Sequence, residues 1–547
     1  MSRDHTMTAF GSATIQNIDA RLRPVLQADR AGIAYAEQVS AEHRKSHGLY
    51  LTPPEVADYM ASLSLPGGET VKLLDPAAGS GILICATVEA LVHRPDAPKR
   101  VNITAYEIDP KLAVILGNVL AKLTTWAAEQ GTEVRATVKN LDFVLACAPA
   151  LQSERGLFPH LKPADSFDMV IANPPYFKLN KADPRAQAAA AVVHGQPNIY
   201  GLFMAIGAAA LRPGGTLIFI TPRSFASGPY FRRFREHFFD CIRPELVHVF
   251  ASRKDAFGRD AVLQENVILK GIRQDGWTRR NTREIMGISS SHGLTDLGDH
   301  VPRSVRLEDV LDMHSRDKVL RLPTSTEDED LVNLVESWKG SLDAYGLRIS
   351  TGPVVPFRAT ELIEKAGDVP RTHVPLLWMN HVKGMQVTWP LGRHKPEYIA
   401  HKMAAQPLLV PNANYVLMRR FSAKEEARRL VAAPYLASAY AVPMVGLENH
   451  LNYVYRPKGQ LTEHEAIGLA ALFNSALLDG YFRISNGNTQ VSATELRTMP
   501  LPSLAVITAL GQRVQRDRPS QDALDELVMM LATADQYKEK EAISGHG

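Results

Sequence analysis

A run of four residues, Asn173-Pro174-Pro175-Tyr176, has the groups needed for chemistry on a nitrogen atom. Its two prolines fix the backbone, so the side-chain oxygen of Asn173 and the carbonyl oxygen of Pro174 can be held as two preset acceptors. Bonded to the hydrogens of a ring-conjugated amino group, they would favour a pyramidal nitrogen whose lone pair can attack a sulfonium methyl group. Tyr176 adds a ring on which a base can stack. The run predicts methyl transfer to a planar amine or amide, without a metal ion; a rigid strand-ending turn is the alternative.

Small residues follow a predicted strand over residues 71–75 and precede a predicted helix over residues 82–91. Small side chains let a ligand approach the backbone, and the N-terminus of a helix presents free N–H groups. The segment has neither the dinucleotide glycine pattern nor the lysine of a phosphate-binding loop, and a plain tight turn is its alternative interpretation. As a cofactor loop it would consist of Asp75, Pro76, Ala77, Ala78, Gly79, Ser80 and Gly81.

Acidic residues lie at the ends of the next two predicted strands. Glu107 closes the first of them, where a carboxylate can bind both hydroxyls of a ribose, and Asp109 is expected to cap the following helix. After the second strand, Asp142 offers an acceptor for an adenine amino group and Phe143 a flat apolar contact, although this pair could also form an ordinary turn. Together with the small-residue loop, these residues indicate a nucleoside cofactor.

Short apolar runs alternate with helix-like segments from residue 71 onward, which is the pattern of a parallel sheet with helices on its faces. We predict an open, doubly wound, Rossmann-like α/β sheet of seven strands whose last strand is antiparallel. Asn173 follows the fourth strand, at the carboxyl edge where open α/β sheets bind ligands. The predicted strands cover residues 71–75, 101–107, 134–139, 167–172, 216–221, 246–250 and 267–272.

The chain has 547 residues, which is too long for one compact domain of common size. A strand over residues 451–455 and helices over residues 463–478 and 521–540 indicate that the second domain is of the α+β class. The predicted division is an N-terminal helical extension at residues 1–47, a catalytic domain at 48–275, a linker region at 276–325 and a second domain at 326–547.

Composition and charge restrict the class of protein. Three widely spaced cysteines form neither a disulfide framework nor a metal pair, and no apolar run suits a signal peptide or a membrane span. We therefore expect a cytoplasmic protein without membrane contact, and a net charge of +3 is too mild to indicate a polyanionic partner. Local candidates for nucleic-acid contact, each with a solvated surface or turn as the alternative, are Arg232-Arg233 with Arg235, Arg393-His394-Lys395, Arg419-Arg420, Arg428-Arg429 and residues 485–491.

The ordered motifs resemble those of the amino-methylating DNA methyltransferases, in the gamma arrangement of the N6-adenine group found in restriction–modification systems. The resemblance covers roughly residues 48–273, and residues 48–57 resemble the motif that covers the methionine end of S-adenosylmethionine. Phe257 is a candidate for the late stacking aromatic of the family, with a surface turn as the alternative. The resemblance implies that Asn173, Pro174, Pro175 and Tyr176 are catalytic and that the cofactor is bound by Tyr50, Thr52, Pro53, Asp75, Pro76, Ala77, Gly79, Ser80, Gly81, Glu107, Ile108, Asp142, Phe143 and Asn173.

The resemblance also carries expectations about activity. It implies methyl transfer from S-adenosylmethionine to N6 of an adenine rotated out of double-stranded DNA, with the C-terminal domain reading the target sequence. A cognate restriction endonuclease as partner, a monomeric state and a location at the bacterial nucleoid are further expectations. Enzymes with the same tetrapeptide that act on cytosine N4, RNA or protein glutamine stay as alternatives. So do the modification subunit of a multi-subunit system, a bifunctional restriction–modification enzyme and a binding-only protein.

Overall fold

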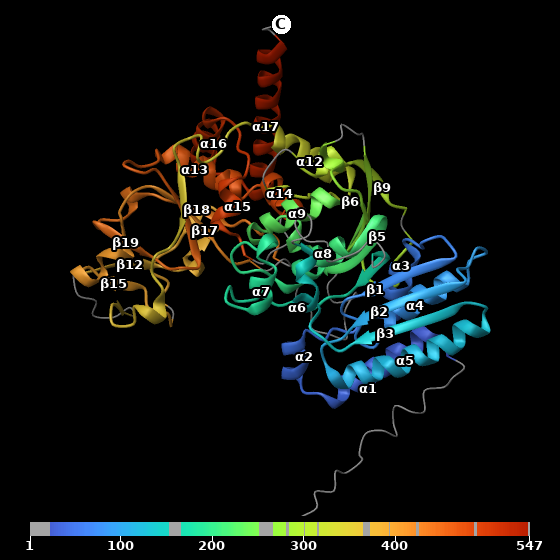
Figure 1. Ribbon diagram of the computed structural model, residues 1–547. Coiled ribbons are helices and arrows are strands. Elements are labelled where there is room, and N and C mark those ends of the chain that lie inside the picture. The colour runs from blue at the N-terminus through green and yellow to red at the C-terminus, as the bar shows by residue number, and fades with distance from the viewer. Residues whose placement is uncertain are drawn as a thin grey trace, which may run out of the picture. The chain divides into compact units, whose positions relative to one another are not determined.

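Figure 1 shows the computed structural model of the chain. The chain divides into two compact units, Met1–Thr324 and Ser325–Gly547, which we call the first and the second unit. The structure describes residues 22–151, 166–250, 266–279, 284–299, 301–313, 317–364, 372–392, 394–422, 426–485 and 490–544.

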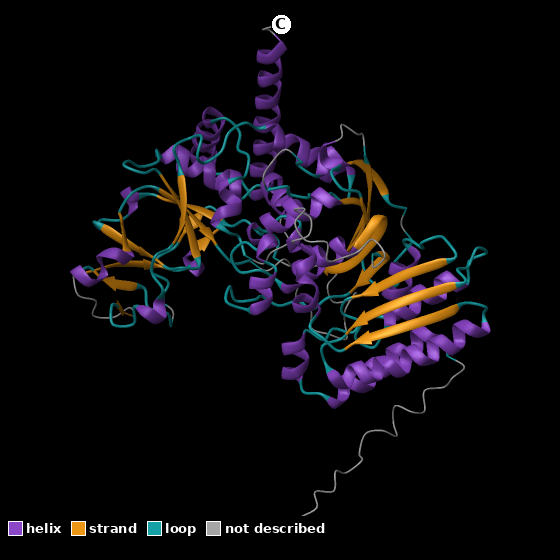
Figure 2. Cartoon of the chain, in the orientation of Figure 1, coloured by secondary structure: helices purple, strands orange, loops and turns teal. Residues whose placement is uncertain are grey.

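The first unit is built on a mixed sheet of nine strands, in the order β3-β2-β1-β4-β5-β7-β6-β8-β9 (Figure 2). Strands β1 to β5 run parallel, and β7 lies antiparallel between β5 and β6. The predicted doubly wound sheet with an antiparallel last strand is therefore confirmed. The strands are β1 Thr70–Asp75, β2 Arg100–Tyr106, β3 Glu133–Lys139, β4 Phe167–Ala172, β5 Leu211–Pro222, β6 Ile242–Phe250, β7 Asn266–Arg273, β8 Ile285–Ser291 and β9 Arg303–Arg306.

Helices cover both faces of this sheet because its central strands carry apolar side chains on both sides. Leu73 and Ile103 belong to the core beneath α1, α3, α4 and α5, whereas Leu74 and Val170 belong to the core beneath α8 and α9. The helices of this unit are α1 Pro24–Gln38, α2 Ala41–His47, α3 Pro54–Ser62, α4 Ile82–Val92, α5 Pro110–Glu129, α6 Phe143–Cys147, α7 Pro184–Ala188, α8 Ile199–Ala210, α9 Arg232–Cys241 and α11 Leu307–Val310.

The predicted linker at residues 276–325 is wrong, because this segment completes the sheet of the first unit. β8 pairs in parallel with β6, and β9 pairs antiparallel with β8. Buried Met286 and Ile288 of β8 extend the apolar core. At the other end of the chain, α1 contributes Val25 and Ala28 to the core, so this helix is part of the fold of the unit.

Helix α5 is the one helix within the described residues that is long and apolar enough to cross a membrane by length and composition alone. Its apolar residues are the ones that recur every three or four positions, including Leu112, Leu116 and Leu123, and all three are buried. They pack against α1, α4 and β3. The apolar face of α5 therefore forms part of the core of the first unit.

The second unit contains two small sheets and a two-stranded ribbon (Figure 2). The four-stranded sheet has the order β10-β20-β17-β18, and the five-stranded sheet has the order β11-β15-β12-β19-β16. The strands are β10 Arg348–Thr351, β11 Ile363–Glu364, β12 His373–Leu377, β13 Val382–Lys383, β14 Gln386–Val387, β15 Tyr398–Ala400, β16 Leu409–Pro411, β17 Tyr415–Arg419, β18 Ala432–Tyr435, β19 Met444–Leu447 and β20 Leu451–Tyr455.

Helices pack beside the four-stranded sheet, and two glycines bring α13 and α16 close together. A Cβ atom at Gly468 would lie 1.9 Å from the carbonyl oxygen of Ile507, and one at Gly511 would lie 1.9 Å from that of His464. The single helix predicted over residues 463–478 is wrong, because it breaks at Asn474, whose side chain bonds to the backbone of β18. The helices are α12 Thr326–Ser337, α13 Glu463–Phe473, α14 Ala476–Ser485, α15 Ala493–Arg497, α16 Leu504–Asp517 and α17 Gln521–Ser544.

Candidate active site

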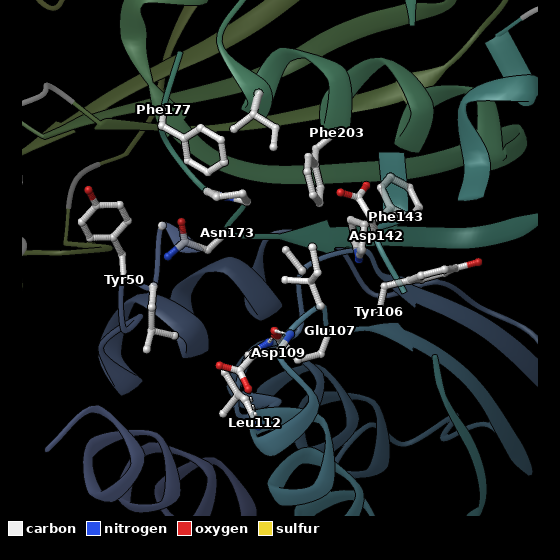
Figure 3. Close-up of a pocket in the computed structure, with 18 of the residues that line it drawn as sticks. Tyr50, Tyr106, Glu107, Asp109, Leu112, Asp142, Phe143, Asn173, Phe177 and Phe203 are labelled. Carbon is white, nitrogen blue, oxygen red and sulfur yellow. Dashed lines mark hydrogen bonds between the residues drawn. The ribbon is translucent and has the colours of Figure 1, made fainter. Parts of the chain in front are cut away.

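A cleft opens at the carboxyl ends of the central parallel strands of the first unit (Figure 3). Its cavity has a volume of about 230 Å³. Ten of the residues predicted from the sequence line it: Tyr50, Pro76, Ala77, Gly79, Glu107, Ile108, Asp142, Phe143, Asn173 and Pro175. The other predicted residues, Thr52, Pro53, Asp75, Ser80, Gly81, Pro174 and Tyr176, are not among its lining residues. We call this space the cofactor cleft.

The loop between β1 and α4 needs its two glycines for different reasons. Both have a positive φ, 55° at Gly79 and 87° at Gly81, which residues with a side chain rarely adopt. A Cβ atom at Gly81 would lie 2.8 Å from Leu116 Cδ1, so this glycine lets α5 pack closely. A Cβ atom at Gly79 would meet nothing within 4 Å. Gly79 thus exposes its backbone to the cleft, where a ligand can approach it.

Asp75 ends β1 as a fully buried carboxylic acid. Its Oδ1 atom accepts a hydrogen bond from the backbone of Ala77 at 3.0 Å, whereas Oδ2 has no partner among the described residues. Burial and, to a smaller extent, the nearby Glu107 raise the pKa of Asp75 to about 8. A buried acceptor without a donor is costly unless a ligand supplies one, and the ammonium group of a bound methionine moiety is suited to do so.

Glu107 follows β2 and faces the same loop. Its carboxylate accepts hydrogen bonds from the backbone nitrogens of Gly79 at 3.0 Å and Asp109 at 2.9 Å. Burial raises the pKa of Glu107 to about 7, against the lowering effect of these two bonds. The carboxylate therefore lies at the edge of the glycine loop, where the predicted ribose hydroxyls would be its ligands.

Asp109 has the capping role predicted for it, and it also ties the N-terminal helices to the cleft. Its side chain accepts from the backbone nitrogens of Lys111 and Leu112 at the start of α5. The Tyr35 hydroxyl donates to the same carboxylate, and His43 Nε2 lies 2.8 Å from it. Sequence reasoning missed Tyr35 and His43, since they lie more than sixty residues from Asp109 and belong to no motif.

Aromatic rings close the far end of the cleft. Phe143 packs with its ring centroid 5.1 Å from Tyr106 and 5.3 Å from Phe203, while the side chain of Ile108 is 47% exposed. Asp142 caps α6 by accepting from the backbone of Leu145, and its other oxygen lies 3.9 Å from Arg185 Nη1. These apolar surfaces and the nearby carboxylate suit a purine ring with an amino group.

Asn173 leaves β4 with both ends of its amide engaged. Its Nδ2 atom donates to Thr52 Oγ1 at 3.0 Å, and its Oδ1 atom accepts from the Tyr176 hydroxyl at 2.5 Å. The same hydroxyl lies 3.0 Å from the carbonyl oxygen of Ile220. Because the nitrogen is held by Thr52, the oxygen of Asn173 is the atom left to act as an acceptor.

The ring of Tyr176 is covered in this structure. Tyr50 stacks on it with centroids 5.4 Å apart and planes inclined by 20°, and Tyr200 meets it edge-on at 6.1 Å. Only 8% of the Tyr176 surface is exposed. The ring of Tyr176, predicted to stack on a target base, is thus covered by Tyr50. The sequence predicts Tyr50 to be a cofactor residue.

Two further candidates from the sequence belong to this unit: Arg235, predicted to contact nucleic acid, and Phe257, predicted to be a stacking aromatic. Arg235 is buried, and its guanidinium donates to the carbonyl oxygens of Phe225, Gly228 and Asp317, so it supports loops of the fold and is not a surface contact for nucleic acid. Burial lowers the pKa of Arg235 to about 10. Phe257 lies outside the described residues. Within the described part of the chain, no group of three His, Cys, Asp or Glu residues gathers to hold a metal ion.

The doubly wound sheet, the glycine loop after β1, the acidic end of β2 and the tetrapeptide after β4 together define an S-adenosylmethionine-dependent methyltransferase. Residues 105–257 match the family model described as Eco57I restriction-modification methylase. Among solved structures, a class I S-adenosylmethionine-dependent methyltransferase from Listeria monocytogenes is similar at 16% identity, with a TM-score of 0.37, over 51% of this chain and 77% of that chain.

Two relatives match nearly the whole chain. Type II methyltransferase M.BsuBI of Bacillus subtilis is 34% identical over 477 residues, which are 86% of this chain and 91% of the relative. Type II methyltransferase M.PstI of Providencia stuartii is 32% identical over 489 residues, which are 89% of this chain and 92% of that relative. The chain therefore belongs to the type II DNA methyltransferases of restriction–modification systems, and its methyl donor is S-adenosylmethionine.

Glu107 should make cofactor binding depend on pH. The sequence predicts that the ionised carboxylate accepts hydrogen bonds from the ribose hydroxyls, and its pKa is about 7. We expect the dissociation constant for S-adenosylmethionine to rise by a further factor of about ten per pH unit as the pH falls below this value, in addition to the rise that Asp75 causes below about pH 8. Calorimetric titration between pH 5.5 and 8.5 measures the effect. Glu107→Gln should bind weakly throughout and lose the step near pH 7, while the step from Asp75 remains and moves to a lower pH, because the Glu107 charge no longer raises the Asp75 pKa.

The matched control is Glu133→Gln, which changes an acidic residue at the exposed start of β3. It should reproduce the wild-type profile. A wild-type dissociation constant that stays level between pH 6 and pH 8 would contradict the assignment of Glu107.

Proposed function

We propose that this enzyme methylates the exocyclic N6 atom of adenine in double-stranded DNA. The observation that carries the proposal is the anchored amide of Asn173, whose nitrogen is bound by Thr52 and whose oxygen remains as an acceptor. An exocyclic amino group is a poor nucleophile because its lone pair is delocalised into the ring. A fixed acceptor for its hydrogen is therefore the group that such a substrate requires.

The acceptors would act on the amino group during methyl transfer. Oδ1 of Asn173 accepts one N–H bond and the carbonyl oxygen of Pro174 accepts the other, which favours a pyramidal nitrogen and stabilises the positive charge that develops on it. The Tyr176 hydroxyl must leave Oδ1 for this to happen. It has a second acceptor at 3.0 Å, the carbonyl oxygen of Ile220, so no buried donor is left unpaired.

The residues of the cofactor cleft fit S-adenosylmethionine, which when bound supplies the methyl group. The unpartnered Asp75 Oδ2 and the exposed backbone of Gly79 would hold its methionine part, with Thr52 at the carboxylate. Glu107 would accept the ribose hydroxyls. Ile108 and Phe143 would contact the adenine ring, and Asp142 its amino group.

The target base needs the face of Tyr176 that Tyr50 now covers. Stacking a base on an aromatic ring contributes roughly 1–3 kcal/mol. Because the opposite side of the ring faces the edge of Tyr200, we propose that the Tyr50 ring moves away and the rotated base takes its place. Tyr50 then acts as a placeholder that keeps the stacking face dry in the DNA-free enzyme.

The second unit, with its two small sheets, is proposed to recognise the DNA sequence. The catalytic groups described above all belong to the first unit, so more than two hundred residues of the chain are available for this role. This unit, Ser325–Gly547, corresponds to residues 326–547, the domain that the sequence predicts to recognise the target.

The base and atom that are modified can be measured directly. Unmethylated bacterial DNA is incubated with the wild-type enzyme and isotope-labelled S-adenosylmethionine, digested to nucleosides and analysed by mass spectrometry. We expect the label in N6-methyldeoxyadenosine. Label in N4-methyldeoxycytidine would overturn the adenine assignment, and label confined to RNA or protein substrates would overturn DNA N6-methylation as a whole.

Removing the amide of Asn173 should abolish methyl transfer and spare cofactor binding. Loss of a preorganised group of this kind costs about 10²–10³-fold in kcat, so we expect at least a 100-fold decrease for Asn173→Ala. The dissociation constant for S-adenosylmethionine should stay within about threefold of wild type, because the other cofactor contacts are intact. Asn118→Ala on the exposed side of α5 is the control. A variant that keeps more than a tenth of wild-type kcat would exclude the catalytic role.

Replacing Tyr50 and replacing Tyr176 should change the fraction of rotated target base in opposite directions. With 2-aminopurine at the target position, the fluorescence lifetime reports the fraction of rotated base. Tyr176→Ala should lower this fraction by roughly 5- to 150-fold, the equivalent of 1–3 kcal/mol. Tyr50→Ala should raise it, because the base no longer displaces a ring. If Tyr50→Ala lowers the fraction as Tyr176→Ala does, Tyr50 is not a placeholder.

A further inference from the structure

Three segments singled out by their sequence come together on one surface of the second unit. They are the basic stretch at residues 393–395, the arginine pair at 419–420 and the polar stretch at 485–491. The meeting point is the turn between β19 and β20, which contains Glu448, Asn449 and His450. Arg393 of the basic stretch and residues 486–489 of the polar stretch lie outside the described part of the chain.

On one side of this turn, Lys395 lies over an aromatic ring. Its Nζ atom is 4.5 Å from the ring centroid of Trp378, the residue that follows β12. The turn is hydrogen-bonded to the residue before Trp378: the backbone nitrogen of Glu448 donates to the carbonyl oxygen of Leu377 at 2.9 Å. The buried carboxylate of Glu448 forms an ion pair with Nδ1 of His450, whose ring is 47% exposed. Lys395 and His450 are thus connected through Trp378 and Glu448.

On the other side of the turn lie Arg420 and Phe421. The Arg420 guanidinium donates to the carbonyl oxygen of Asn449 at 3.1 Å, and the ring of Phe421 meets the ring of His450 at 5.1 Å. The polar stretch joins here, since Gln490 forms a β-bridge with Phe421 and the backbone of Val491 donates to the carbonyl oxygen of Arg420. We call Lys395, His450 and Arg420 the basic track.

The region around the track is strongly basic, which the mild net charge of the whole chain conceals. Residues 369–462 contain twelve Lys and Arg but only four acidic residues, while the rest of the chain has 49 Lys and Arg against 54 acidic residues. Of the four acidic residues, Glu397 and Glu448 are each only 1% exposed. Glu397 is paired with buried His381 at 2.7 Å. Of the remaining two, Glu425 lies outside the described residues, and the exposed Glu426 lies 3.8 Å from Nη1 of Arg419.

The cations of the track are available to an anion. Among the described residues, neither Lys395 nor Arg420 has a carboxylate within ion-pair distance. Arg420 uses one of its five N–H donors on Asn449, and Lys395 is held over Trp378 by a contact that leaves its three donors open. Aromatic support restricts both side chains, so less conformational entropy is lost when they bind.

We propose that the basic track binds the phosphate backbone of double-stranded DNA. The proposal rests on the proposed DNA methylation and adds where in the second unit the duplex lies. The phosphates of a duplex can pair with the charges of Lys395 and Arg420, and the exposed ring of His450 between them can donate a hydrogen bond to the backbone. Gln490 and Asn449 border the track, where their amides can reach the edges of bases.

The test compares Lys395→Gln, Arg420→Gln and the double variant with Lys458→Gln as the matched control. Lys458 is an exposed cation of the same unit, at the opposite end of β20, roughly 17 Å from His450 by strand length. Binding to a fluorescent duplex is measured by anisotropy over a series of salt concentrations. Each phosphate contact contributes a slope of about 0.9 to the dependence of log K on log salt.

At about 0.1 M salt each single variant should bind DNA roughly eightfold more weakly, and the double variant should lose about 1.8 from the salt slope. The dissociation constant for S-adenosylmethionine, and kcat at saturating DNA, should not change. Lys395→Arg should restore binding, which separates loss of charge from loss of fold. Lys458→Gln should behave like wild type.

Unchanged affinity and salt slope in the double variant would overturn the basic track, as would equal losses with Lys458→Gln. Tighter binding of duplex RNA than of duplex DNA by the wild type would overturn DNA as the occupant. The outcome is independent of which base is methylated, because binding is measured without turnover. A wild-type product other than N6-methyladenine would therefore refute the proposed function and leave this result standing.

Discussion

The amide of Asn173 must point in one direction for the proposed methyl transfer, and much of the first unit serves this constraint. An amide is pseudo-symmetric, so its oxygen faces the substrate only if another group binds its nitrogen. Thr52 supplies that group from a segment 121 residues earlier in the chain. Thr52 can be there because α3 begins directly after it and packs on α4, which follows the glycine loop. The catalytic acceptor is therefore positioned by the same elements that form the cofactor cleft.

The cofactor cleft holds two carboxylates in surroundings that oppose their charge. Burial raises the pKa of Asp75 to about 8 and that of Glu107 to about 7; Glu107 also makes Asp75 harder to ionise, and Asp109 does the same to Glu107. Keeping these groups buried therefore costs stability in the cofactor-free protein; the cost grows as the pH rises from about 4, where the unfolded chain ionises them, and levels off above about 8. A ligand that carries an ammonium group, a sulfonium group and two hydroxyls offsets the cost. The cleft gains selectivity for such a ligand from the same burial that destabilises it when empty.

The sequence was sufficient to predict the seven strands from β1 to β7, because each is an apolar run bounded by turn residues. It was also sufficient to predict that the loop after β1 and the ends of β2 and β4 meet in one cleft, since strand ends at one edge of a parallel sheet must lie together. β8 was missed because its sequence, Ile285–Ser291, ends in three serines and lacks an apolar run. The stack of Tyr50 on Tyr176 and the bonds of Asp109 to Tyr35 and His43 join residues far apart in the chain. Such contacts depend on tertiary packing and leave no periodic signal.

The net charge of the whole chain does not indicate whether the protein binds a polyanion such as DNA. The sum over the whole chain is +3, and each basic stretch taken alone is compatible with a solvated surface. Folding separates these charges: Arg235 is withdrawn into the core of the first unit, where it bonds to carbonyl oxygens, while Glu397 and Glu448 are withdrawn into the second unit. These two carboxylates pair with His381 and His450 and form no ion pair with Lys395 or Arg420 among the described residues. An anion-binding surface therefore arises as much from where the acidic residues are buried as from where the basic residues lie.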